Sequence, residues 1–217
     1  MVVIVVPLTY LNGPEYNNMN QIELTGLIKN IQPSHKIKDI EYDQAHLLVT
    51  RADGREDLLT LKFKKYSNKY SENDQVELLG NIRSYSEKLA DGRNKVSLYV
   101  FTYFDLPEEP ACNHFKIDGR ICKLEDIRKT KSGKHNIHFI LANNLIIEET
   151  NQKLNSYLPC IAWGKTALDI AKLHVNDKVI IEGEFHSREY KKTLPDGELE
   201  IRVAHELAVK SFEVINE

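Results

Sequence analysis

The 217-residue sequence is poor in the residues that build metal centres and disulfide frameworks. Its three cysteines, Cys112, Cys122 and Cys160, form no CxxC pair of the kind that is typical of structural zinc sites. An odd number of thiols in a chain without a recognisable signal peptide indicates free cysteines in a reducing cytosol. We therefore expect a cytoplasmic protein that contains no metal.

Long apolar runs and an excess of charge of one sign are also lacking. The N-terminal run from Val2 to Val6 is five residues, too short for a signal peptide or a bilayer span. The formal net charge of −3 argues against a protein that coats duplex DNA, but it permits a basic surface on one face. The sequence therefore predicts no membrane attachment.

Signatures of catalysis are lacking as well. We find no Ser-His-Asp arrangement and no pair of carboxylates at a spacing that supports catalysis. The Gly164-Lys165-Thr166 string lacks the upstream glycine of a phosphate-binding loop, because position 159 is a proline. We therefore predict a binding protein rather than an enzyme, with no catalytic residues and no cofactor.

What the sequence does contain is an internal duplication. Three patterns of the first half recur in order in the second half: residues 20–28 as 113–121, 73–84 as 176–187, and 91–100 as 196–203. The first match places Gly119 where Gly26 stands, and the second repeats the Asn73-Asp74 dipeptide. Ordered matches of this kind indicate two copies of one structural unit.

Each copy has the pattern of a small closed sheet. Short stretches with a period of two alternate with turn signals, which predicts strands and hairpins. Gly26 and Gly119 interrupt the first strand of each copy, which indicates a bend or bulge. A helical pattern that begins at Thr166 occurs only between strands three and four of the second copy. The prediction is an all-β protein of two tandem OB-fold barrels, the second with this short helix.

The predicted organisation has four parts. We expect an N-terminal extension at residues 1–18, which includes a candidate edge strand, and a divergent first OB-fold at 19–104. A linker at 105–112 then leads to the second OB-fold at 113–217. Pro107 and Pro110 make this linker short and stiff.

Aromatic and basic residues are combined in the stretch from 157 to 192. Tyr157 and Trp163 share one face of a predicted strand, because side chains separated by an even number of residues point the same way. A basic stretch with Tyr190 inside it follows the next strand. Rings on a solvated sheet face, with cations nearby, suit unpaired bases and their phosphates. Packing of Tyr157 and Trp163 in a core is the competing interpretation.

The motifs of the second copy resemble the bacterial single-stranded DNA-binding protein family in order and spacing. The matching segments are 113–121, 128–133, 139–142, 162–167, 179–183, 187–190 and 211–215. The resemblance covers about residues 113–215 and extends only weakly to 20–104. It implies that bases stack on Tyr157, Trp163 and Tyr190.

The resemblance also implies a set of cations that contact nucleic acid. These are Arg120, Arg128, Lys129, Lys131, Lys134, Lys165, Arg188, Lys191 and Lys192. The weaker candidates of the first copy are Phe63, Lys64, Lys65, Arg83 and Tyr85.

The first copy is expected to have a reduced stacking face. In the sequence comparison Phe63 takes the place of Trp163, Asp57 that of Tyr157 and Glu87 that of Tyr190. The carboxylates of Asp57 and Glu87 are expected to repel phosphate.

The predicted function is sequence-independent binding and protection of single-stranded DNA in replication, recombination or repair. The predicted location is the cytoplasm, in association with the nucleoid. Affinity is expected from base stacking and phosphate neutralisation. Because the family often presents four barrels per assembly, two barrels per chain imply a homodimer. Two alternatives stay open: a protein-interaction module of a replication or mobile-element complex, and a binder of single-stranded RNA.

Overall fold

Alternation of buried and exposed side chains runs along nearly every strand of the computed structural model. The structure describes residues 19–66, 70–88, 92, 94–105, 112–147, 152–193 and 197–215. The strands are β1 (Asn20–Ile37), β2 (Ile40–Thr50), β3 (Glu56–Lys64), β4 (Gln75–Lys88), β5 (Asn94–Asp105), β6 (Asn113–Leu124), β7 (Arg128–Lys129), β8 (His135–Ile147), β9 (Gln152–Trp163), β10 (Lys178–Thr193) and β11 (Leu199–Val214). The predicted N-terminal extension and most of the predicted linker lie outside the described residues.

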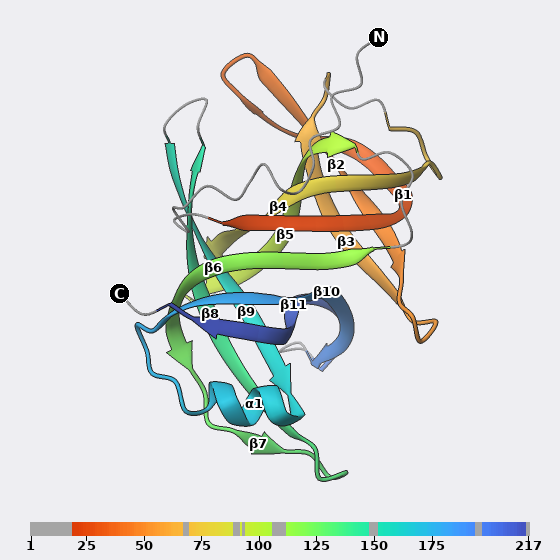
Figure 1. Ribbon diagram of the computed structural model, residues 1–217. Helices are drawn as coiled ribbons and strands as arrows, with labels where there is room; N and C mark the ends of the chain where they lie inside the picture. The colour runs from red at the N-terminus through yellow and green to blue at the C-terminus, as the bar shows by residue number, and fades with distance from the viewer. Residues whose placement is uncertain are drawn as a thin grey trace.

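The strands form two closed sets. In the first, β1 pairs with both β2 and β4, and β3 pairs in parallel with β5. In the second, β6 pairs with both β8 and β10, and β9 pairs in parallel with β11. The prediction of two tandem OB-fold barrels is confirmed. Figure 1 shows the first barrel above the second.

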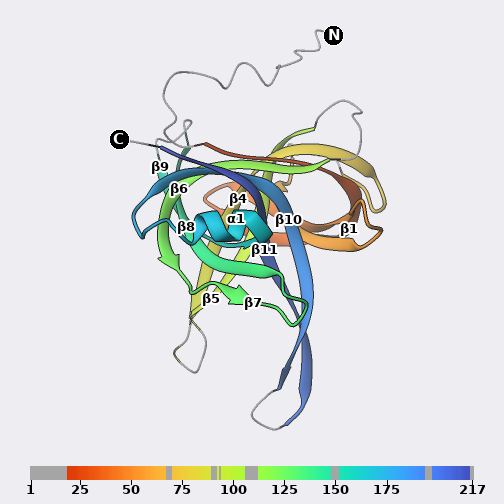
Figure 2. The same cartoon turned by 60° about the horizontal axis from the view of Figure 1, so that its bottom comes forward.

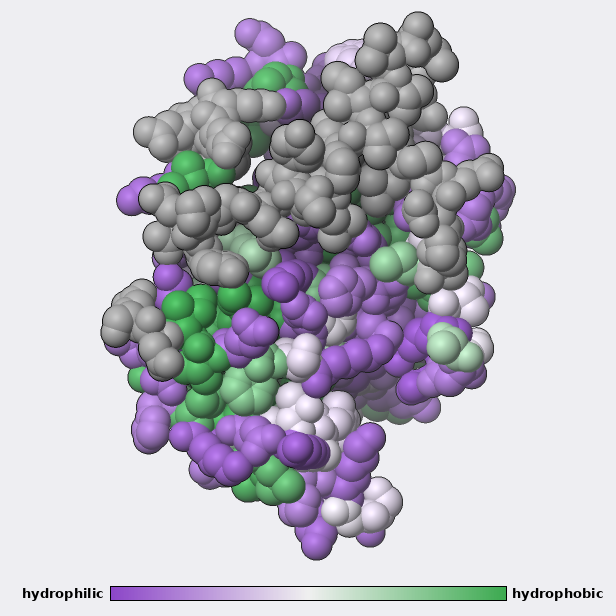
Figure 3. Space-filling model, viewed as in Figure 1, coloured by the Kyte–Doolittle hydropathy of each residue, from purple (hydrophilic) through white to green (hydrophobic). Residues whose placement is uncertain are grey.

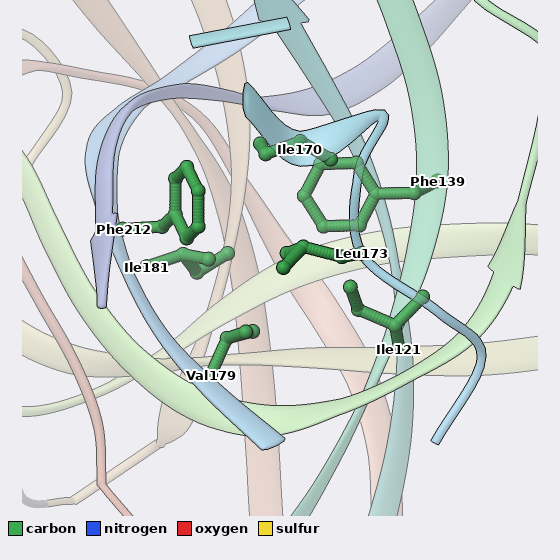
Figure 4. A pocket seen from close by; sticks show the side chains of 7 residues that line it. All are labelled: Ile121, Phe139, Ile170, Leu173, Val179, Ile181 and Phe212. Atoms are coloured by element: carbon green, nitrogen blue, oxygen red, sulfur yellow. The ribbon is translucent and has the colours of Figure 1, made fainter. Parts of the chain in front are cut away.

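A short helix closes one end of the second barrel. Helix α1 (Gly164–Ile170) follows β9 directly, and side chains from α1, the segment after it and four strands converge beneath it (Figure 4). They are Ile121, Phe139, Ile170, Leu173, Val179, Ile181 and Phe212. The expected helix start at Thr166 was wrong, because Gly164, with a φ of 61°, turns the strand into the helix two residues earlier. Thr166 Oγ1 instead donates a hydrogen bond to the Lys210 carbonyl at 3.1 Å.

The duplication is visible in the backbone hydrogen bonds. Asn73 and Asn176 both adopt a positive φ, of 69° and 85°. The Asn73 N–H donates to the Ile28 carbonyl at 2.8 Å, and the Asn176 N–H donates to the Ile121 carbonyl at 2.7 Å. Asparagine is one of the few residues that tolerates this conformation, so both copies retain it at the same turn.

The glycines of the first strand in each barrel are required by a close approach of the neighbouring strand. A Cβ atom added to Gly26 would lie 2.5 Å from the Leu48 carbonyl oxygen, and one added to Gly119 would lie 2.6 Å from that of Ala142. The register shifts of β1 and β6 occur elsewhere along these strands. The expected bulge is therefore not at the glycines themselves.

The two barrels share one continuous sheet, because β1 pairs antiparallel with β6. At the centre of this pairing Ile22 lies opposite Phe115, which is its own counterpart in the second copy. The two barrels are thus related by a pseudo-twofold axis, as in a symmetric dimer whose subunits have been fused into one chain.

Asparagine side chains connect this joint to the fourth strand of each barrel. Asn20 donates to the Ile82 carbonyl at 2.7 Å and accepts from the Ile82 N–H at 2.8 Å. Asn113 makes the same pair of bonds with Phe185, both at 2.9 Å. Asn20 also donates to Asn143 Oδ1 at 2.8 Å, which links the first barrel directly to β8.

Two serines make a second set of contacts between the barrels. Ser84 Oγ of β4 accepts a hydrogen bond from the Tyr157 N–H at 2.8 Å. Its counterpart, Ser187 Oγ of β10, accepts one from the Leu58 N–H at 2.9 Å. The third strand of each barrel is therefore connected to the fourth strand of the other.

The symmetry is broken at Asp57, whose side chain is fully buried at this contact. Its carboxylate accepts hydrogen bonds from the Arg51 guanidinium at 2.5 and 2.6 Å and from the Ser187 N–H at 2.5 Å. It also shares a hydrogen bond of 3.0 Å with His186 Nδ1. Burial alone would raise the pKa of Asp57, but the bonds to His186, Arg51 and Ser187 outweigh it and hold the pKa well below its usual range.

We predict that Asp57→Ala lowers the free energy of unfolding by about 3–5 kcal/mol, because it leaves the Arg51 charge unpaired and poorly hydrated. Urea denaturation measures the change. The folded-state pKa of Asp57 is below the unfolded one, so its contribution is present at neutral pH and is lost on acidification. The difference between wild type and variant should therefore narrow at low pH. Glu87→Ala, which removes an exposed carboxylate, serves as the control and should change stability by no more than about 0.5 kcal/mol.

Candidate nucleic-acid interface

Tyr157 and Trp163 lie on the outer face of β9, where 53% and 39% of each residue is exposed. The opposite face, with Leu158 and Cys160, is buried in the barrel. At about 3.3 Å per residue, the two rings stand about 20 Å apart along the strand. The core interpretation of these rings is therefore wrong, and both are accessible to a ligand.

Cations surround the Trp163 end of β9. Trp163 lies opposite Asn136 of β8, so the β7–β8 hairpin, which carries Lys129, Lys131 and Lys134, is beside the ring. Lys134 Nζ is 5.4 Å from the centre of the indole. The chain continues from Trp163 into α1, which places a further cation at Lys165. A ring and four lysines thus occupy one end of the second barrel.

The third predicted ring lies on the long β10–β11 hairpin, which extends beyond the barrel in Figure 2. Tyr190 is 36% exposed, and the Arg188 guanidinium is 5.8 Å from its ring centre. Sequence reasoning missed Arg202, which lies directly opposite Tyr190 in β11. Tyr190 and Arg202 are separated from the Asp196-Gly197 turn by nearly the same number of residues, and this spacing could have predicted that they pair. Arg202 also forms an ion pair with Glu200 at 2.6 Å.

Most of the predicted cations are not neutralised. In the described part of the chain, no carboxylate lies within ion-pair distance of Lys129, Lys131, Lys134, Lys165, Lys191 or Lys192. Arg128 pairs with Glu125 at 2.9 Å and Arg188 with Glu206 at 3.5 Å. Both pairs are partly exposed and therefore weak, so a phosphate can compete for the arginine. Arg120 donates to the Asn176 carbonyl at 3.0 Å and lies two strands from Tyr157, because Arg120 is opposite Ala142 and Ala142 is opposite Tyr157.

The hydropathy of the face seen in Figure 3 differs between its centre and its left side. Hydrophilic side chains cover most of the centre, and hydrophobic ones gather along the left side. The sheet that joins the barrels crosses this face in Figure 1.

The first barrel differs from the sequence expectation by one residue in β3. The parallel pairings of β3 with β5 and of β9 with β11 make Leu61 the counterpart of Cys160. Lys64 rather than Phe63 therefore corresponds to Trp163. A shift of one residue turns a side chain to the opposite face of a strand. Phe63 is accordingly 2% exposed and packs in the core, so it is not a stacking residue.

The same register corrects the expectation for Asp57. Leu58 is the counterpart of Tyr157, and Asp57 is the counterpart of the neutral, buried Ser156. Because Asp57 is enclosed between the barrels, it does not face phosphate. Glu87 is exposed and does stand at the position of Tyr190.

The remaining first-copy candidates lie on the outer surface. Lys65 forms an ion pair with Glu41 at 2.9 Å. Lys64 is half-buried at the end of β3. Tyr85 is 48% exposed, and the Arg83 guanidinium lies 4.0 Å from the centre of the Phe101 ring.

Two closed five-stranded barrels and a row of exposed rings define a tandem OB-fold binding protein. Residues 112–215 match the model of the Single-strand binding protein family. The match covers the second barrel, and it supports single-stranded DNA binding as the function. No curated protein sequence matches the chain significantly.

Solved structures extend the likeness to both barrels. A deletion variant of the single-stranded DNA binding protein from Thermus aquaticus has a TM-score of 0.69 and 16% identity, over 94% of this chain and 97% of that one. The wild-type protein from the same organism has a TM-score of 0.66 and 16% identity, over 93% and 95%. At this level of identity the likeness shows that the tandem fold is shared.

Two further classes of site were sought among the described residues. None of the helices described is long and apolar enough to cross a membrane. The same residues contain no group of three or more His, Cys, Asp and Glu side chains that could hold a metal ion.

We predict that the affinity for single-stranded DNA falls steeply with salt. Each neutralised phosphate on a single strand contributes about −0.7 to the slope of log K against log salt. The cluster of unpaired lysines therefore predicts a slope of a few units, measured by titration of oligo-dT at several salt concentrations. A slope near zero would contradict a phosphate-contacting role for these lysines.

Proposed function

We propose that the chain binds single-stranded DNA without sequence preference and that the second barrel provides most of the affinity. The observation that carries this proposal is the row of exposed rings on β9 and β10, Tyr157, Trp163 and Tyr190. The lysines that flank it have no carboxylate within ion-pair distance among the described residues. Every base has a face that can stack on a ring, so such a row accepts any sequence.

The division of labour between the barrels follows from their counterpart residues. The positions of the three rings are taken in the first barrel by Leu58, Lys64 and Glu87. The first barrel therefore lacks this row of rings. We assign residues 19–104 and 113–217 to the two binding units, with unequal contributions.

The proposed role is protection of exposed single strands during replication, recombination or repair, by coverage rather than by catalysis. A homodimer would bring four barrels together on one strand. The family match favours DNA as the ligand, and RNA remains the alternative because rings stack on the bases of either polymer.

We predict that Trp163→Ala combined with Tyr190→Ala loses about one to four powers of ten in affinity. Base stacking in single-strand binding proteins contributes about 1–3 kcal/mol per base, and two rings are removed. The measurement is fluorescence anisotropy of a labelled oligo-dT, because the variant has lost the only tryptophan. Tyr66→Ala, which removes a ring that is 78% exposed on the first barrel, is the control and should retain wild-type affinity. Equal losses in the two variants would refute the proposed division between the barrels.

We also predict that duplex DNA does not compete with single-stranded DNA. The faces of paired bases are covered by their neighbours, so the rings of β9 and β10 reach only unpaired bases. Quenching of Trp163 fluorescence by oligo-dT, oligo-U and duplex DNA tests this, and every signal comes from one residue. Effective competition by duplex would show that stacking is not the source of affinity, and stronger binding of oligo-U would favour RNA.

A further inference from the structure

The first barrel carries its own group of rings and cations, none of which is the counterpart of Tyr157, Trp163 or Tyr190. We call it the first-barrel ring surface, and it consists of Tyr42, Lys62, Arg83, Tyr85, Tyr99 and Phe101. These residues come from four neighbouring strands, β2, β3, β4 and β5. They point outward, because the residues that alternate with them, such as Leu61, Ile82 and Val100, are buried in the barrel.

The members of this surface are in mutual contact. Lys62 Nζ lies 5.0 Å from the ring centre of Tyr85 and 4.7 Å from that of Tyr99. Arg83 covers Phe101, and the Tyr42 ring lies 6.1 Å from Phe101. Rings and cations therefore form one continuous band across the strands.

The band extends further onto the β1–β2 hairpin. There His35 stacks on Tyr42, with ring centres 4.7 Å apart and planes 6° from parallel. The two rings also line an open groove with Lys36 and Lys65. The groove is lined on its other side by Glu41 and Asp43, so its charge is mixed.

Lys62 is the member that most needs a partner from outside the chain. It is partly buried among the rings, and burial lowers its pKa. Within the described residues no carboxylate lies within ion-pair distance of it. Partial loss of water without a counter-ion disfavours the charged lysine, and a phosphate placed beside it would remove that penalty.

Strand β4, which carries Arg83 and Tyr85, lies beside the strand β9 that carries Tyr157. Ser84, the residue between Arg83 and Tyr85, accepts its hydrogen bond from the backbone of Tyr157. Arg83 and Tyr85 point to the other face of β4 from Ser84, so this contact places the two surfaces on adjacent strands.

We propose that the first-barrel ring surface binds a further segment of the same single strand, through base contacts to Tyr85, Tyr99 and Tyr42 and phosphate contacts to Lys62 and Arg83. This inference rests on the proposed function, since it adds a second contact region to it. The site differs from the second-barrel site in position, because none of its residues is the counterpart of Tyr157, Trp163 or Tyr190. The surface recognises unpaired bases together with their phosphates.

The test compares a short and a long oligonucleotide. One OB-fold covers about 4–16 nucleotides, so an oligo-dT of about 8 nucleotides occupies the second barrel alone, whereas one of about 35 spans both. Lys62→Ala with Tyr85→Ala should reduce affinity for the long oligo about tenfold or more and leave that for the short one unchanged. Tyr85 is exposed, so the variant should stay folded, which thermal unfolding confirms.

Two matched variants serve as controls. Lys62→Arg with Tyr85→Phe keeps the cation and the ring, and should bind the long oligo as wild type does. Lys29→Ala removes one charge from the same barrel beside Asn73, away from the ring surface, and should have little effect.

Three outcomes would contradict these proposals, and they are distinguishable. Undiminished affinity of the Lys62→Ala/Tyr85→Ala variant for the long oligo would overturn the inference and leave the proposed function intact. A change of assembly state in sedimentation, with unchanged DNA affinity per chain, would identify the surface as a protein interface and also overturn it. Failure of the wild-type chain to bind either oligo would refute the proposed function itself.

Discussion

The antiparallel pairing of β1 with β6 is the constraint on which the arrangement of the whole molecule depends. Within its own barrel the first half of each strand pairs only with the fourth strand, so the pairing between β1 and β6 satisfies backbone groups that would otherwise form an exposed edge. It joins eleven strands into one sheet and fixes the pseudo-twofold axis at Ile22 and Phe115. Once the axis is fixed, the third strand of each barrel must meet the fourth strand of the other.

These equivalent contacts have diverged in chemistry. On one side of the axis Ser156 and Ser84 are neutral, and their contact needs only two hydrogen bonds. On the other side Asp57 is a buried charge that is stable only because Arg51 and its other donors surround it. The start of β3 is therefore buried between the barrels, whereas the start of β9 carries the exposed ring of Tyr157 next to the equivalent contact.

The sequence predicted well those features of the structure that depend on local sequence signals. The duplication and the barrels follow from repeated turns such as those at Asn73 and Asn176, which act within a few residues. The register of β3 could not be predicted in this way, because an aromatic residue with a lysine two positions after it occurs at both Phe63 and Trp163. The face on which each ring lies is decided by the pairing of β3 with β5 and of β9 with β11, and these partners are far apart along the chain. The contact of Lys62 with Tyr85 and Tyr99 depends on the same long-range pairing.

The two ring surfaces differ in how much of each ring is left for a ligand. In the second barrel Lys134 lies 5.4 Å from the centre of the Trp163 ring and Arg188 lies 5.8 Å from that of Tyr190. The rings of β9 stand about 20 Å apart, so each can accept a separate base. In the first barrel Lys62 and Arg83 already cover Tyr85, Tyr99 and Phe101. A base that stacks there must share or displace a cation–π contact worth about 0.5–2 kcal/mol, which offsets part of the gain from stacking. The closer cation contacts of the first-barrel rings therefore favour weaker binding by that barrel, without the repulsion between Asp57 and phosphate that the sequence had suggested.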